Sequence, residues 1–131
     1  MKKIGVINSI LSAVLARVGH TDQIVVADAG FPCPAAVPLV DLALFPGTPT
    51  TRDIVRVIES ELVLERYVMA TESESHSPHV LREFAQLLPD LSSQLVPHQE
   101  FKSLSHQAAV VVRSGDVAPY SNILVIVGVP Y

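Results

Sequence analysis

The sequence predicts an α/β fold, a three-layer sandwich built on a mixed, mainly parallel β-sheet. Apolar residues at helical spacing alternate along the chain with short β-branched runs, the order typical of strands that are connected through helices. The short runs lack polar alternation, as expected of strands that are buried on both faces. The last two runs, 108–112 and 123–129, have no helix-length segment between them. They are therefore predicted to form a hairpin, which makes the sheet mixed.

The first helix and the first strand are clearly marked. Asn8 or Ser9 can accept hydrogen bonds from the free N–H groups of a helix start. Apolar residues then recur at helical spacing over 11–18, and Gly19 is predicted to end the helix. The β-branched run 23–27 is too short for a helix and is predicted to be a buried strand.

The next part of the chain begins with a proline-rich segment. Residues 31–49 carry five prolines, so they are predicted to form an ordered loop with a short edge strand around 39–44. Thr50 or Thr51 can cap the helix that follows this loop. Residues 67–70 are predicted to be the next strand.

The remaining elements continue this alternation. Ser77 and Pro78 suit the N-cap and the first position of a helix, which continues with apolar residues through 88. Residues 95–96 are predicted to be a short strand, and a brief helix follows it through 101–104.

Length and cysteine content bound the class of protein. A chain of 131 residues fits one domain, 1–131, and a core of this size is stable without disulfide bonds or other cross-links. The single cysteine, Cys33, cannot form an intrachain disulfide, and no targeting segment is evident, so we expect a cytoplasmic protein. Prolines interrupt the longest uncharged stretch, 117–131, so no membrane span is expected.

Charge and hydrophobicity indicate the kind of partner. The formal net charge is −4 and the nine Lys and Arg residues are scattered, so nucleic acid is not an expected partner. Apolar residues make up 49% of the chain, more than one small core requires. We therefore expect both faces of the sheet to be covered and subunits to cover each other in a homo-oligomer larger than a dimer.

Motifs of several common chemistries are absent. The sequence contains no phosphate-binding G-x-x-x-x-G-K, no G-x-G-x-x-G, no G-x-S-x-G and no C-x-x-C. Glu72, Glu74, His76 and His79 could in principle gather a metal ion. They lie in a Ser-rich segment, 71–79, that is predicted to be a solvated connection, so no metal site is expected.

Three further residues have reactive or titratable side chains. Cys33 is flanked by prolines with no cation nearby in the sequence, and it is predicted to be inert. His106 lies in a polar stretch and is predicted to be on the surface. His98 opens a short helix directly after an apolar run and stays a candidate site residue.

A histidine and an aspartate flank the first predicted strand. Ligands of α/β folds gather where loops leave the carboxyl ends of parallel strands, and Asp28 stands at such an end. His20 lies in the turn before the same strand. The residues alone leave two interpretations open: a functional histidine, or one that caps the helix while Asp28 and Gly30 shape a turn.

Seven short motifs, in order along the whole chain, are similar to those of the D-ribose pyranase family. They are Met1-Lys2-Lys3, Asn8-Ser9, Gly19-His20-Thr21-Asp22, Ala27-Asp28-Ala29-Gly30, His98-x-Glu100-Phe101-Lys102, Arg113-Ser114-Gly115 and Pro119-Tyr120-Ser121-Asn122. The related fucose mutarotases lack the Asp-Ala-Gly-x-Pro-x-Pro form of residues 28–34, so the ribose type is favoured. The departures are Ser121 for the usual alanine, Asp116 for glutamate, and Phe31 and Cys33 for aliphatic residues.

This resemblance implies an isomerase that interconverts the pyranose and furanose forms of D-ribose. It also implies ring-shaped homo-oligomers, commonly decamers, that need neither metal nor cofactor, with pockets that we expect to be completed between subunits. His20 would be the proton donor. The residues that would bind the sugar are Asp28, His98, Tyr120, Ser121 through its backbone, and Asn122. Opening a hemiacetal requires proton exchange, and a histidine with an ordinary pKa of about 6.5 can give and take protons near neutrality.

Two alternatives stay open. One is a mutarotase for fucose or another monosaccharide, and the other is a non-catalytic sugar-binding or regulatory subunit. A subunit that only binds sugar could dispense with His20 but not with Asp28 and Asn122. The complete set therefore favours catalysis.

Overall fold

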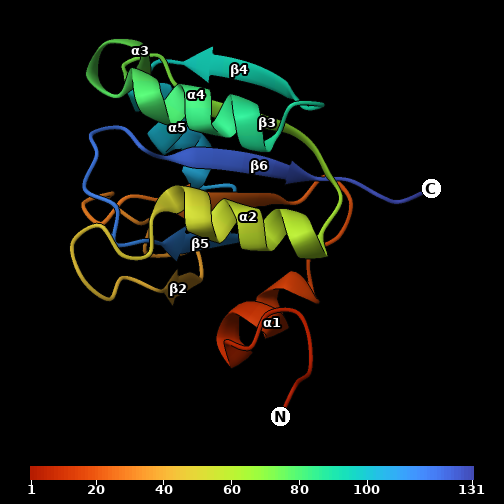
Figure 1. Ribbon diagram of the computed structural model, residues 1–131. Helices are drawn as coiled ribbons and strands as arrows, with labels where there is room; N and C mark the ends of the chain where they lie inside the picture. The colour runs from red at the N-terminus through yellow and green to blue at the C-terminus, as the bar shows by residue number, and fades with distance from the viewer.

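The structure is a computed structural model that describes all 131 residues (Figure 1). Its elements in chain order are α1 (Ser9–Leu15), β1 (Gln23–Ala27), β2 (Leu39–Asp41), α2 (Thr51–Glu61), β3 (Leu64–Ala70), α3 (Ser73–His76), α4 (Pro78–Leu87), β4 (Ser92–Val96), α5 (His98–Ser105), β5 (Val110–Arg113) and β6 (Ile123–Val127). The strands form one sheet in the order β2-β5-β1-β6-β3-β4. β6 pairs antiparallel with β1 and β3, and the other pairings are parallel. The sheet is therefore mixed and mainly parallel, as predicted.

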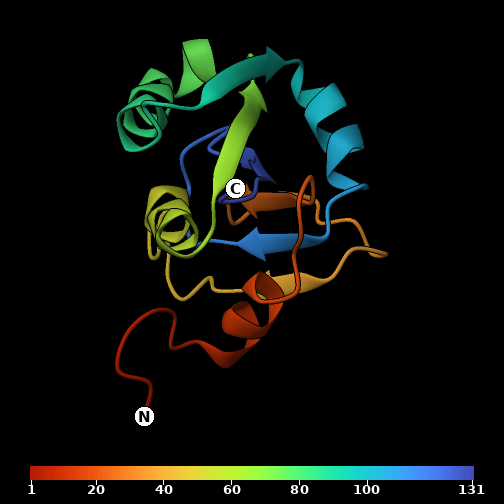
Figure 2. The same ribbon diagram turned by 90° about the vertical axis from the view of Figure 1, so that its right-hand side faces the viewer.

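Helices lie on both faces of the sheet (Figure 2). On one face α1, α2 and α4 contribute Leu15, Ile58 and Phe84 to a shared hydrophobic core. On the other face α5 and the loop after β1 contribute Phe101 and Phe31 to a second, smaller core. The predicted three layers are confirmed. None of the helices combines the length and the apolar character that a bilayer crossing requires.

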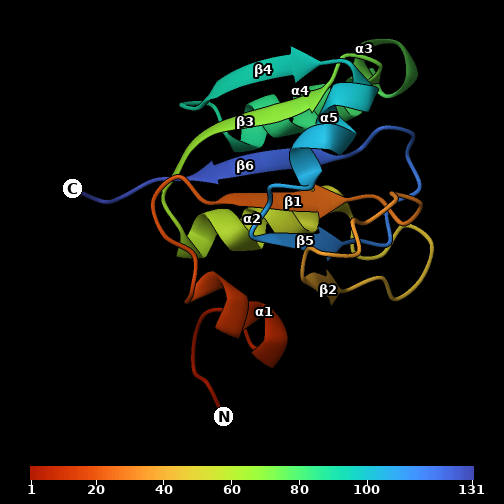
Figure 3. The same cartoon turned by 180° about the vertical axis from the view of Figure 1, so that it is seen from behind.

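The predicted hairpin between the last two strands is wrong. β1 lies between them, paired in parallel with β5 on one side and antiparallel with β6 on the other. No helix is needed between β5 and β6 because the connection, residues 114–122, only has to cross the carboxyl end of β1 (Figure 3). This crossing brings the connection against Asp28, whose backbone N–H donates to Asn122.

The observed helix boundaries agree only in part with those predicted from the sequence. Thr50 caps α2 through a capping box with Asp53, as predicted. α1 begins after Asn8 but ends at Leu15, because the chain turns toward β1 before it reaches Gly19. Ser77 is the N-cap residue of α4 and Pro78 opens the helix, as predicted, but the Ser77 side chain makes no capping hydrogen bond and its hydroxyl donates to the Pro119 carbonyl.

Candidate functional site

One edge of the sheet collects most of the predicted site residues. The carboxyl ends of the parallel strands meet at this edge, on the right of Figure 3, and the reversed strand β6 begins there. Asp28 follows β1, and His98 follows β4 at the start of α5. Tyr120, Ser121 and Asn122 directly precede β6. Asp28 thus lies at the carboxyl end of a parallel strand, as predicted. Because β6 runs in the opposite direction, the segment before it also lies at this edge.

Two hydrogen bonds join Asp28 and Asn122. The Asn122 amide donates from Nδ2 to Oδ2 of Asp28 at 2.8 Å, and its Oδ1 accepts from the backbone N–H of residue 28 at 2.8 Å. The Gly30 N–H donates to Asp28 Oδ1 at 3.0 Å. Burial nevertheless raises the pKa of Asp28 above its usual value, and the neighbouring Asp116 carboxylate adds to the rise. The carboxyl group is rigidly held and is poised to accept hydrogen bonds from a polyol.

His98 lies in an aromatic cluster. Its ring is stacked on Phe101 at a centroid distance of 6.4 Å, and it meets Phe31 at 6.2 Å and Tyr120 at 5.0 Å edge to face. Nδ1 is buried and has no hydrogen-bond partner. Burial, followed by the charge of Lys102, lowers the pKa of His98 below its ordinary value. This shift favours the neutral imidazole.

Tyr120 adopts an unusual backbone conformation. Its φ is +58°, in the left-handed region that few non-glycine residues occupy. Ser73 Oγ donates to the Tyr120 carbonyl oxygen at 2.9 Å, and Ser77 Oγ donates to that of Pro119. The next residue, Ser121, is fully buried and its hydroxyl has no partner.

A shallow cavity opens beside Asp28. It has a volume of about 280 Å³ and is lined by residues 28–30 and 116–119. Asp116 does not offer its carboxylate freely, because Oδ2 accepts from the N–H and hydroxyl of Thr51 and Oδ1 accepts from the N–H of Ala118. Its contacts fix the first turn of α2 against the site loop.

His20 lies at the opposite edge of the sheet from Asp28. It precedes β1, whereas Asp28 follows it, and a strand of this length spans about 15 Å at the usual rise per residue. His20 Nε2 is 2.8 Å from Oε1 of Glu65, and the two side chains are 51% and 43% exposed. Within one chain, His20 therefore cannot contact a monosaccharide bound at Asp28.

The turn that carries His20 is well ordered by its own contacts. The Gly19 N–H donates to Asp22 Oδ2 at 2.8 Å, and Asp22 N–H donates back to the Gly19 carbonyl. Thr21 takes a φ of +70° and donates its N–H to the Val127 carbonyl. Because α1 has ended at Leu15, His20 does not cap that helix.

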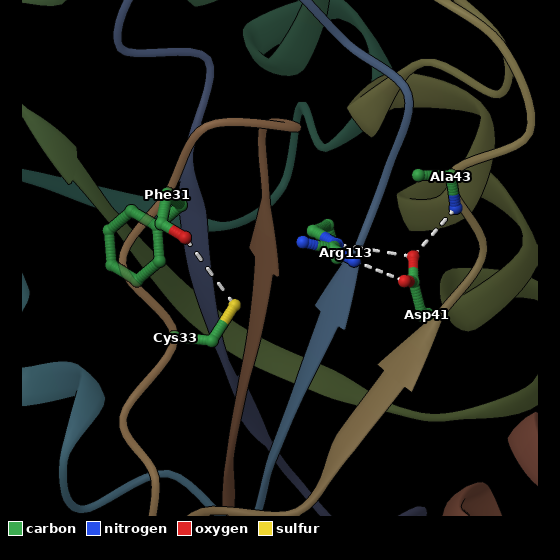
Figure 4. Close-up of polar contacts among 5 residues, drawn as sticks. All are labelled: Phe31, Cys33, Asp41, Ala43 and Arg113. Atoms are coloured by element: carbon green, nitrogen blue, oxygen red, sulfur yellow. Dashed lines mark hydrogen bonds and ion pairs between the residues drawn. The ribbon is translucent and has the colours of Figure 1, made fainter.

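Cys33 has a cation nearby that the sequence did not indicate (Figure 4). The charge of Arg113 acts on its thiol, but the guanidinium is engaged by Asp41, whose carboxylate accepts from both Nε and Nη2. The Cys33 thiol approaches the Phe31 carbonyl at 3.6 Å, and burial raises the pKa of the thiol despite the guanidinium. A raised thiol pKa is consistent with the predicted inertness. His106, by contrast, is exposed, as predicted.

The segment 71–79 connects β3 to α4 and is mostly exposed, as predicted, but it is not a simple loop. It contains α3, and Ser73 and Ser77 are fully buried. Glu72 Oε2 accepts from the backbone N–H of His98 at 2.9 Å, and the His76 ring lies 5.0 Å from that of Tyr120. No three His, Cys, Asp or Glu side chains are placed to share a metal ion. The signal for Glu72 was its position two residues after β3, close to the strand end as Asp28 is after β1.

Sequence comparison assigns the chain to a family. A model of the RbsD / FucU transport protein family matches residues 1–130. The chain belongs to this family. A protein of Chloroflexus aggregans named D-ribose pyranase is 42% identical over 131 residues, and the alignment covers all of both chains. A D-ribose pyranase of Pseudomonas putida is 44% identical over 132 residues, again with both chains covered completely.

Solved structures have the same fold. Bacillus subtilis RbsD, in a structure with D-ribose, has a TM-score of 0.96 and 37% identity, with both chains covered completely. The fucose mutarotase of Streptococcus pneumoniae, solved with L-fucose, has a TM-score of 0.85 at 21% identity and likewise covers the whole chain. The second likeness supports the fold alone.

Proposed function

We propose that this member of the RbsD/FucU family is a D-ribose pyranase, an isomerase that interconverts the pyranose and furanose forms of D-ribose. The observation that carries the proposal is the gathering of Asp28, His98, Tyr120 and Asn122 at one edge of the sheet. This group combines a fixed carboxyl, an imidazole and an aromatic ring, which suits a sugar with hydroxyl groups and an apolar face. The names of the full-length relatives support ribose as the sugar.

The reaction consists of proton transfers around one bond cleavage and one bond formation. A proton leaves the anomeric hydroxyl, the bond between the anomeric carbon and the ring oxygen breaks, and the ring oxygen takes up a proton. The open aldehyde recloses when a different hydroxyl attacks and the proton transfers reverse. His20 acts as the proton donor. Asp28 orients sugar hydroxyls, and Tyr120 and the backbone of Ser121 complete the contacts. No redox step occurs, so no redox cofactor is needed, and the proposed enzyme also works without a metal ion.

The site is completed between subunits in this proposal. His20 is half exposed and lies too far from Asp28 to act on a sugar bound in its own chain. A neighbouring subunit that presents its Gly19–Asp22 turn to the Asp28 edge would supply the missing proton donor. The expected assembly is a homo-oligomer larger than a dimer, with a decamer as the specific proposal.

Exposed apolar side chains support such an assembly. Ile4, Ile7 and Ile10 before and within α1 are 81%, 77% and 63% exposed, and Leu44 and Phe45 in the loop after β2 are 82% and 69% exposed. Large apolar side chains that cluster at a surface favour burial against a partner. We place the enzyme in the cytoplasm. Disulfides are rare in that compartment, and a chain with a single cysteine has no intrachain disulfide to maintain. Neither nucleic acid nor a membrane has a part in the proposal.

Exchange spectroscopy by NMR tests the function directly. The wild-type protein should accelerate exchange between ribose pyranose and furanose, equally with and without excess EDTA. His20→Ala should reduce the acceleration by about 10² to 10⁴-fold, the usual contribution of acid–base catalysis. His106→Ala, which changes an exposed histidine outside the site, is the matched control and should be fully active.

Other outcomes of this experiment would change the assignment. Acceleration for fucose but not for ribose would make the protein a fucose mutarotase, and binding of ribose without acceleration would make it a sugar-binding subunit. Loss of activity in EDTA would contradict the cofactor-free mechanism. Light scattering would contradict the shared site if it found a monomer at micromolar concentration.

A further inference from the structure

Four side chains on or beside α3 contact His98, Tyr120 or the residue before Tyr120. We call Glu72, Ser73, His76 and Ser77 the α3 contact group. Its members reach two loops that are distant in sequence, the start of α5 and the connection before β6. Glu74, in the same short helix, is exposed and makes no side-chain hydrogen bond or ion pair. The contacts are therefore specific to four positions and are not a general feature of the helix.

Glu72 fixes the start of the helix that carries His98. The N-cap of α5 is Pro97, which offers no side-chain hydrogen bond to the first turn. Glu72 Oε2 takes this place from outside the helix by accepting from the His98 N–H at 2.9 Å. A carboxylate at a helix N-terminus is favoured because the free N–H groups there carry partial positive charge. The His98 backbone is thereby tied to the end of β3.

The two buried serines fix the backbone of Tyr120. Ser77 Oγ donates to the carbonyl before this residue, and Ser73 Oγ donates to the carbonyl of Tyr120 itself. Together they hold the two peptide groups on either side of Tyr120. These groups set its left-handed backbone conformation, which costs free energy for any residue that has a Cβ atom. The His76 ring contacts the Tyr120 ring edge to face, with ring centroids 5.0 Å apart. Tyr120 is thus held from its main chain and from its ring.

We propose that the α3 contact group positions His98 and Tyr120 for sugar binding, and that Glu72 is its principal member. This inference rests on the proposed function only in naming ribose as the ligand. His98 and Tyr120 belong to different loops, and their ring centroids are 5.0 Å apart. One short segment that holds both loops sets the relative placement of the two rings. Each member acts through His98 or Tyr120 and is a positioning residue.

The charge of Glu72 gives this role a distinct signature. The ionisable groups that face His98 are Glu72 and Asp28, which favour the protonated ring, and Lys102 on its own helix, which opposes it. Glu72→Gln keeps an oxygen that can accept from the His98 N–H but removes the negative charge. Sugar affinity should therefore survive in Glu72→Gln, while the pKa of His98 should fall further.

The test compares Glu72→Ala, Glu72→Gln and the control Glu74→Ala in the full-length assembly. Ribose affinity is measured by saturation-transfer NMR, and the His98 ring is followed by its side-chain ¹H–¹⁵N resonances without sugar. Glu72→Ala should weaken ribose binding by about tenfold, as one well-placed hydrogen bond typically does, and should shift the His98 resonances. Glu72→Gln should restore affinity and lower the pKa of His98. Glu74→Ala should match the wild type in both measurements.

The two possible failures are separable. If the wild type neither binds nor isomerises ribose, the proposed function fails, while the His98 resonances still test the positioning. If Glu72→Ala keeps the wild-type His98 resonances and affinity, the positioning role is overturned. Ser73→Ala is a second variant that leaves the Tyr120 carbonyl without its donor. Unchanged Tyr120 ring resonances in Ser73→Ala would overturn the role at Tyr120.

Discussion

Mixed assemblies of two inactive variants should recover activity if each site takes His20 from one subunit and Asp28 from another. His20→Ala removes the proton donor, and Asp28→Ala removes the carboxyl at the opposite edge of the sheet. When the two variants are co-expressed in equal amounts, half of the His20 and half of the Asp28 side chains are intact. Because they pair at random across interfaces, about one quarter of the sites contain both residues.

The strand between these residues spans about 15 Å, so one chain cannot supply both residues to one site, and recovery must come from sites shared between subunits. The assay is ribose exchange by NMR on co-expressed, doubly tagged assemblies, with each variant alone as the baseline. Wild type mixed with the double variant is the matched control. It should retain about one quarter of the wild-type activity if sites are shared, and about one half if each chain carries its own site. No recovery in the mixture of single variants would refute the shared site.

Three further outcomes concern stability. Thr50→Ala should lower the free energy of unfolding by about 1 kcal/mol in thermal denaturation, because it removes the capping box of α2; an unchanged melting temperature would contradict this. Ser121→Ala should raise stability by about 1 kcal/mol, because it removes a buried hydroxyl that has no partner, whereas a loss would show that the hydroxyl is satisfied. Because the pKa of folded His98 is lowered from 6.5, the unfolded chain binds the proton more tightly, and stability should fall as the pH drops below about 6.5. His98→Gln should make this decline shallower, and an identical pH dependence would contradict the shift.

Elements that depend on local pattern were predictable. Asn8 and Thr50 cap helices, and residues 23–27 form a buried strand, because capping and apolar periodicity act over a few residues. The Asp28 prediction succeeded for a related reason. Any residue that directly follows a parallel strand emerges at the carboxyl edge of the sheet.

Strand order could not be obtained in this way. Sequence adjacency favoured pairing of β5 with β6, yet β1 inserts between them because β5 can pair with it in parallel. The connection then crosses the end of β1 and places Asn122 on Asp28. That contact joins residues that are 94 positions apart, and no local pattern specifies it.

The sequence by itself determined the layered α/β architecture, the capping signals and the motifs that resemble the D-ribose pyranase family. Only the tertiary structure decided which site residues meet within one chain. It buries Ser73 and Ser77 in a segment whose polar composition predicted solvent, because their hydroxyls find carbonyl partners in the connection before β6. It also separates His20 from Asp28, because residues at the two ends of a strand face opposite edges of the sheet however close they are in sequence.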